Sequence, residues 1–276
     1  MVGTKGAWWG HISASRGSLL PLDRLQVEHA AQMRLPSRRV GLGIIHHPQS
    51  GLVLWDSGIH PRLRDSTSRW PFWLYRFLVP FTLAPEETAL AQLQSRGHKA
   101  GDVKAVILTH LHSDHVAGVL DFPEAEIICP RKDWEDCKGS RGFKALRKAF
   151  FPDLFPASLD PRLRLIDGHD SVPDFLTPFS HGTDLFGDGS CWMVAMPGHS
   201  PGHMGVYLKT TDGPVLMAAD ACWRSRSYLE NADVPGVVHR ILTPAPSDFR
   251  RTLERLHLFH RRNPEVKILL SHCPDC

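Results

Sequence analysis

The chain has 276 residues, of which 42% are hydrophobic and 22% are charged, a profile typical of a soluble globular protein. Its formal net charge of only +3 gives no case for nucleic-acid binding, which requires a clustered basic face. No run reaches the roughly 18 apolar residues of a membrane span, and the N-terminal residues lack the pattern of a signal peptide. We therefore expect a cytoplasmic protein without an integral membrane segment.

The predicted elements begin with two strands, 39–47 and 52–55, joined by a turn. A helix over 86–95 precedes an apolar strand over 103–109, typical of a strand covered on both faces. A helix is expected from Asp114. Further strands are predicted over 126–129, 192–196, 205–208, 215–218 and 266–270, with an amphipathic helix over 248–261. Because the strands form two groups, each followed by helices, we expect one α/β domain over 1–276, an αββα sandwich of two mixed sheets flanked by helices.

Residues 69–81, here called the aromatic segment, carry six aromatic side chains and little alternation. Apolar surface left in water is unfavourable by about 25 cal/mol per Å², so something must cover it. The segment is either a buried loop or short helix, or an apolar lid over a site within an insert at 60–85. In the second interpretation Trp73 and Phe77 line the substrate pocket. A surface that touches lipid is a third alternative.

Four potential metal ligands follow the buried strand directly, in the run Thr109-His110-Leu111-His112-Ser113-Asp114-His115. Imidazole nitrogens and carboxylate oxygens are suitable zinc ligands. His110 and His112 are two residues apart and point the same way on an extended segment. Asp114 and His115 lie where the chain turns into a helix, so the short run can serve two adjacent metal sites. A surface histidine-rich turn would not explain why the run ends a buried strand.

Other candidate ligands also stand where predicted strands end. The loop Met196-Pro197-Gly198-His199-Ser200-Pro201-Gly202-His203 offers two histidines, Asp220 follows an apolar strand, and His272 follows the last strand. We interpret His203 as bracing its loop through a hydrogen bond rather than as a ligand. Cys273 and Cys276 form a C-x-x-C pair that we interpret as structural or incidental, because no second such pair is present.

These motifs, HLHSDH and PGHSPGH with the late aspartate and histidine, resemble the metallo-β-lactamase superfamily from about Val40 to His272. The order and spacing are most similar to the N-acyl-homoserine lactonases. The resemblance implies a first metal held by His110, His112 and His199, a second held by Asp114, His115 and His272, and a bridge formed by Asp220. It also implies that Asp56 supports the metal-binding loop from behind, since such carboxylates orient histidine ligands.

The resemblance further implies two divalent ions, with Zn²⁺ expected and Fe, Mn or Co as alternatives, and a small-molecule substrate with an acyl ester or lactone. A hydroxide bridging the ions would attack the carbonyl. Asp114 and Asp220 are the expected catalytic carboxylates, Asp114 carrying the proton to the leaving group. Trp223 stands where the lactonases usually carry a tyrosine that contacts the substrate carbonyl, so we place Trp223 in the substrate pocket without an acid role.

Two alternatives to a lactone or ester hydrolase stay open. The first is a thioester hydrolase of the glyoxalase II type, which has the same set of metal ligands, although we expect no glutathione-binding domain after His272. The second is a sensor that holds metal and ligand without turnover. The complete set of seven ligands favours an enzyme over a sensor.

Overall fold

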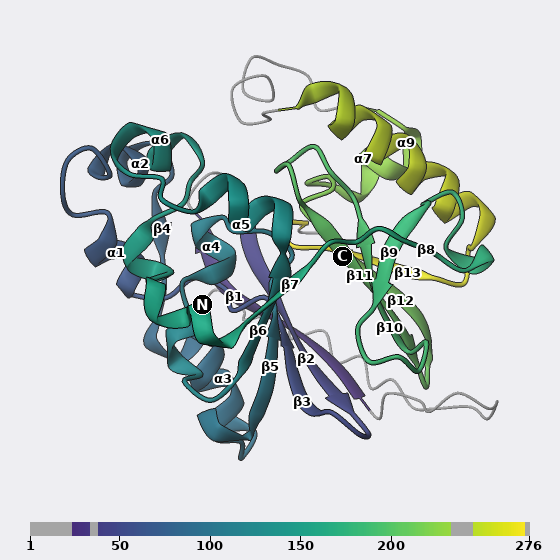
Figure 1. The fold of residues 1–276 in the computed structure, drawn as a ribbon, viewed down its shortest axis with the longest axis horizontal. Helices are drawn as coiled ribbons and strands as arrows, with labels where there is room; N and C mark the ends of the chain where they lie inside the picture. The colour runs from purple at the N-terminus through teal and green to yellow at the C-terminus, as the bar shows by residue number, and fades with distance from the viewer. Residues whose placement is uncertain (1–23, 34–37, 233–244, 274–276) are drawn as a thin grey trace, which may run out of the picture.

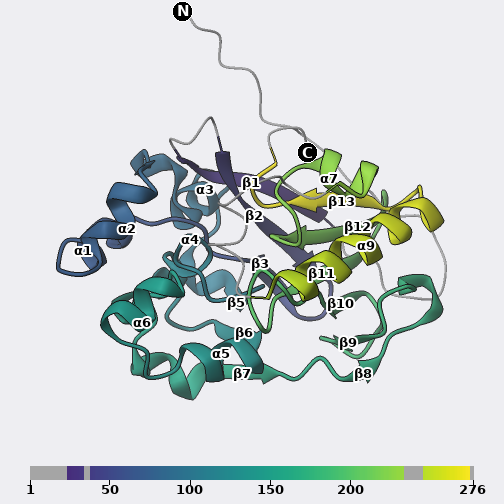
Figure 2. The ribbon, with the colours of Figure 1, turned by 90° about the horizontal axis from the view of Figure 1, so that it is seen from above.

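The computed structural model describes residues 24–33, 38–232 and 245–273, and the expectations for the N-terminal residues and for Cys276 lie outside these ranges. The chain forms two β-sheets that lie face to face with helices outside them (Figures 1 and 2). Of the helices in the described ranges, none has the length and apolar character needed to cross a membrane.

The first sheet has seven strands in the order β4-β1-β2-β3-β5-β6-β7. Strands β1 to β3 pair antiparallel, whereas β3, β5, β6 and β7 pair in parallel. The strands span β1 Arg24–Met33, β2 Arg38–His47, β3 Gly51–Trp55, β4 Phe81–Thr82, β5 Val103–Ile107, β6 Glu126–Pro130 and β7 Leu163–Ile166. The helices on this half are α1 Arg62–Ser66, α2 Trp73–Leu78, α3 Ala89–Ser95, α4 Ser113–Val116, α5 Arg131–Cys137 and α6 Gly142–Arg147.

The second sheet has six strands in the order β13-β12-β11-β10-β9-β8, antiparallel except for the parallel pair β12 and β13. Its strands span β8 Asp170–Ser171, β9 His181–Asp184, β10 Cys191–Ala195, β11 Met204–Thr210, β12 Gly213–Ala219 and β13 Lys267–Leu270. Two helices, α7 Ser225–Glu230 and α9 Pro246–Arg262, cover its outer face (Figure 1).

Three apolar layers account for this arrangement. Alternate residues of β5 separate the layers: Val106 packs toward the helices of the first half, and Ile107 packs between the sheets against residues such as Met217. A third layer joins the second sheet to α9 through Leu253 and Phe259. Because successive side chains of a strand point to opposite faces, a strand apolar on both faces must be covered on both. The expected αββα sandwich is confirmed.

Most predicted elements lie within two residues of the observed ones, but two helices differ. The predicted helix over 86–95 is split, because Thr88 caps a new helix by accepting a hydrogen bond from Ala91 N at 3.3 Å, and a 3₁₀ turn over Pro85–Glu87 precedes it. The helix expected from Asp114 is the single turn α4. Gly118, just after α4, packs closely against Ser57. A Cβ added to Gly118 would lie 2.5 Å from the Ser57 carbonyl oxygen.

The directions of the strands bring several chain segments to one edge of the sandwich. The parallel strands β3 and β5 end at the same edge of the first sheet, and β10, β12 and β13 end together in the second. Backbone hydrogen bonds join the sheets there, from Gly41 N to Ser271 O at 2.8 Å and from Met204 N to Thr109 O at 3.0 Å. Residues that follow these strand ends are therefore neighbours in space.

Gly198 holds the loop after β10 against α9. It has a φ of +137°, and an added Cβ would lie 2.3 Å from the Phe249 backbone. We expect Gly198→Ala to lower the free energy of unfolding by about 1–3 kcal/mol more than Gly97→Ala, because the clash adds to the backbone strain. Gly97 is the control, since it has a φ of +84° and no atom within 4 Å of the added Cβ. Urea denaturation measures both, and equal losses would contradict the close packing.

Candidate metal centre

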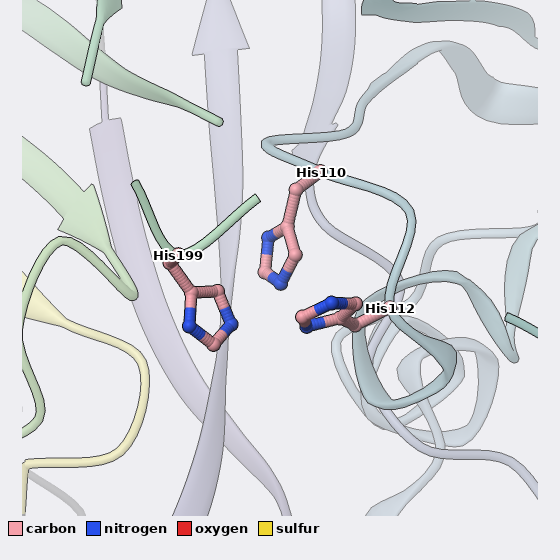
Figure 3. Close-up of side chains that lie close together, drawn as sticks. All are labelled: His110, His112 and His199. Carbon is pink, nitrogen blue, oxygen red and sulfur yellow. The ribbon is translucent and has the colours of Figure 1, made fainter. Parts of the chain in front are cut away.

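Three histidines from two distant segments of the chain point toward one another at the shared edge (Figure 3). His110 and His112 follow β5, and His199 lies in the loop after β10. One ring nitrogen of each lies within 4.8 Å of the others. This group matches the first metal set that the sequence resemblance implies.

A second group lies beside the first. Asp114, His115 and His272 also place one ligand atom each within 4.8 Å of one another, and Asp220 forms a third such group with His110 and His115. Asp220 Oδ2 lies 3.2 Å from Nε2 of His199 and 3.2 Å from Nε2 of His272. One carboxylate oxygen thus contacts a histidine of each metal set, which is the position that a bridging ligand requires.

Several polar atoms in this cluster are buried and make no hydrogen bond of acceptable geometry within the described residues, even where an oppositely charged group is near. They are Nε2 of His110, Nε2 of His115, both ring nitrogens of His199 and Oδ1 of Asp220. A buried polar group without a partner costs about 1–3 kcal/mol, so several converging ones indicate that another species binds them. Imidazole and carboxylate donors at this spacing fit divalent cations such as zinc.

Asp56 fixes the orientation of two of these histidines. His115 Nδ1 donates to Asp56 Oδ2 at 2.7 Å, which leaves Nε2 of His115 facing the cluster. Thr109 Oγ1 donates to the same carboxylate at 3.0 Å and lies 3.0 Å from His110 Nδ1. The Thr109 hydroxyl therefore accepts a hydrogen bond from His110 Nδ1 and so fixes the orientation of that ring. A hydrogen bond at one ring nitrogen determines which nitrogen is free to bind metal.

The carboxylates and histidines of the cluster shift one another's pKa values. Burial would raise the pKa of Asp220, but the surrounding histidines, His272 first, hold that pKa well below its ordinary value. Burial would lower the pKa of His272, yet Asp220 and Asp114 raise it to about 10. Burial dominates at His110 and His199, whose pKa values lie well below the ordinary one. The site therefore combines neutral imidazoles at His110 and His199 with ionised carboxylates, whose charge a protonated His272 offsets.

Asp133 at the start of α5 ties the two ligand-bearing loops together, and sequence reasoning missed it. Its carboxylate accepts hydrogen bonds from Leu111 N at 3.3 Å and Ser200 Oγ at 2.7 Å, and from Gly202 N at 2.5 Å. Burial raises the pKa of Asp133 to about 6, with these donors opposing the shift. The one sequence feature that could have identified Asp133 is its position, three residues after the end of the buried strand β6.

His203 braces its loop, as expected from the sequence. Its Nδ1 donates to Met196 O at 2.9 Å, and its Nε2 accepts from Asp220 N at 3.1 Å, so both ring nitrogens are used within the protein. Trp223 is buried beside the cluster, with its ring perpendicular to that of His199 at 6.0 Å and close to Phe249. Its place in a substrate pocket stays a prediction.

The other two residues expected in the substrate pocket, Trp73 and Phe77, lie on the outer side of α2. Their side chains are 43% and 74% exposed. Together with Trp70 and Leu78, and with Phe143 of α6, they form an apolar surface on the outside of the molecule. The inner side of the same helix carries Phe72 and Tyr75, which pack edge-on against Phe151.

With the geometry in place, comparison with known proteins identifies the family. The sequence pattern of the Metallo-beta-lactamase superfamily matches residues 43–272. The chain belongs to this superfamily. Members of the metallo-β-lactamase superfamily bind divalent metal ions, and the relatives described below support the assignment of this chain as a metal-dependent hydrolase.

The relatives fall in the lactonase-like group of the superfamily. A Mycobacterium tuberculosis protein named as a "probable metallo-hydrolase" is 28% identical over 82% of this chain and 72% of its own length. The N-acyl homoserine lactonase AttM of Azorhizobium caulinodans is 29% identical over 69% of this chain and 65% of its own. A solved N-acyl homoserine lactone hydrolase, with N-hexanoyl-L-homoserine at its catalytic metal centre, shares the fold at a TM-score of 0.71 and 18% identity, covering 93% of this chain and 95% of its own.

We expect Asp56→Asn to weaken zinc binding about 10- to 100-fold while the fold persists, because the amide can still accept from His115 but lacks the charge that makes the imidazole a stronger ligand. Asp121→Asn is the matched control. Asp121 pairs with His60 at 3.2 Å and with Arg62 at 2.6 Å, in a carboxylate–histidine contact separate from the candidate ligands. Competition with a chromogenic chelator measures both affinities, and an Asp56 variant that binds zinc like wild type would refute the orienting role.

Proposed function

We propose that this chain is a binuclear metal-dependent hydrolase that opens acyl lactones, with N-acyl-homoserine lactones as the leading candidates. The observation that carries the proposal is the pair of adjacent ligand groups that share Asp220. The lactonase relatives support the substrate class.

The proposed ligand roles follow the two groups. His110, His112 and His199 would hold the first ion, Asp114, His115 and His272 the second, and Asp220 would contact both. Zn²⁺ is the expected metal, in agreement with a dizinc lactonase that shares the fold at a TM-score of 0.58. When bound, such ions activate water at neutral pH and polarise the substrate carbonyl.

The chain's own residues would orient the substrate and move the proton. Asp114 lies 3.3 Å from His272 through one carboxylate oxygen, Oδ2, which leaves the other oxygen available to carry a proton to the leaving alkoxide. Trp223 would exclude water on the side of His199. The exposed aromatic rings of α2, Trp73 and Phe77 among them, would cover a long acyl chain that extends out of the site.

We expect Asp220→Ala to lose far more metal than His203→Ala. Removing a carboxylate that lies between both groups should affect the binding of both ions. His203, in contrast, uses both ring nitrogens in hydrogen bonds with Met196 O and Asp220 N. The wild type should contain two ions per chain by elemental analysis after purification in zinc. The Asp220 variant should also lose about 100-fold or more in kcat/KM. Equal losses of metal in the two variants, or a wild type that holds one ion or none, would contradict the binuclear assignment.

The substrate class is tested with a panel of N-acyl-homoserine lactones of increasing chain length, simple aryl esters and acyl thioesters, assayed with zinc-loaded protein. We expect the lactones to be the best substrates, with kcat/KM rising with chain length because apolar contact grows with each methylene. Higher activity on thioesters would instead support the glyoxalase II type of reaction. Turnover of none of these compounds, despite full metal loading, would favour a ligand-binding protein.

A further inference from the structure

Tyr75 differs from its neighbours in the aromatic segment because its polar end reaches the candidate metal centre. Trp73 and Phe77, four residues apart, share the outward face of helix α2, whereas Phe72 at its N-cap and Tyr75, three residues apart, share the inward face. The Tyr75 ring packs edge-on against Phe151, with the ring centroids 5.0 Å apart. This contact fixes the ring and directs its hydroxyl inward.

The Tyr75 hydroxyl lies directly beside the ligand-bearing turn. Ser113 Oγ donates to Tyr75 Oη at 3.2 Å, and Ser113 stands between the candidate ligands His112 and Asp114. Burial raises the pKa of Tyr75, and the charges of Asp114 and Asp220 raise it further, so the hydroxyl lies within the field of both carboxylates. The phenol therefore keeps its proton at neutral pH and can donate it in a hydrogen bond.

The hydrogen-bond pattern leaves this donor available. One hydrogen bond joins the two hydroxyls, and with Ser113 as its donor the O–H of the phenol is left to donate to another group. Apart from Ser113 Oγ, no acceptor for this O–H is found among the residues that the structure describes. Trp223, which lies beside His199, has a side chain without a hydroxyl.

We propose that Tyr75 is a catalytic residue that donates a hydrogen bond to the carbonyl oxygen of the lactone as this oxygen gains negative charge. The inference rests on the proposed lactone hydrolysis and names a residue for it. In that reaction the oxygen of water bonds to the carbonyl carbon, the ring C–O bond breaks, and the leaving alkoxide takes the proton of the water. Tyr75 forms and breaks no covalent bond, and its proton stays on its own oxygen.

Ser113 is the positioning residue of this pair. Its backbone N–H donates to Ala149 O at 2.9 Å, so replacement of the side chain leaves the turn anchored. Loss of the Ser113 hydroxyl frees the phenol to rotate about its C–O bond without removing it. The effect of Ser113→Ala should therefore run in the same direction as that of Tyr75→Phe and be smaller.

The kinetic test compares wild type, Tyr75→Phe and Ser113→Ala on the best lactone of the panel. If Tyr75 donates to the developing oxyanion, Tyr75→Phe should lower kcat about 100-fold, while KM and zinc content should change less than about threefold. Tyr207→Phe is the matched control, because it removes a hydroxyl from a residue buried under α9. An unchanged kcat in Tyr75→Phe with an active wild type overturns the inference and leaves the proposed function intact.

A spectroscopic test does not depend on turnover. The chain has only three tyrosines, so protein labelled with 3-fluorotyrosine gives three ¹⁹F resonances, and Tyr75→Phe assigns one of them. Addition of ring-opened N-hexanoyl-L-homoserine to the zinc-loaded protein should shift the Tyr75 resonance and leave the Tyr207 resonance in place. A Tyr75 resonance that does not move at the highest ligand concentration overturns the inference. A wild type that turns over no lactone refutes the proposed function separately.

Discussion

A single buried carboxylate sets the geometry on which the candidate metal centre depends. Asp56 follows β3 with a φ of 55°, a left-handed conformation that is unfavourable for a residue with a side chain. Its backbone N–H donates to Ile107 O at 2.8 Å, so the sheet itself holds this strained position. The carboxylate then orients His115 directly and His110 through Thr109. The strained residue Asp56 at the end of β3 thus fixes the orientation of two candidate ligands, His110 and His115.

The same logic extends to the second sheet. Ala219 has a φ of 47° immediately before Asp220, so the strand β12 also turns sharply where it delivers its carboxylate. Asp133 restrains the two loops that carry the histidines, and His203 restrains the backbone of Asp220. Most of the residues around the cluster hold other residues in place, and this is how a site of seven side chains from four strand ends keeps its geometry.

The sequence predicts the centre of this protein better than its periphery. Buried strands such as β5 carry a strong apolar pattern, and a polar residue directly after such a strand has a fixed place in space, so the positions of His110, Asp220 and His272 could be predicted. Short elements such as β8 and α1 have too few residues to show a period. Asp133 and Tyr75 could not be assigned from the sequence, because their roles depend on contacts with residues far away in the chain.

The candidate ligands are divided between the two sheets, and this division has a consequence for folding. His110, His112, Asp114 and His115 belong to the first half of the chain, whereas His199, Asp220 and His272 belong to the second. Ions that bind both sets only in the folded chain would stabilise that chain by mass action, because unfolding would separate the two sets and release the ions. The two sheets would then be joined at one edge by coordination and along their faces by apolar packing, so metal supply would govern the lifetime of the fold as well as its chemistry.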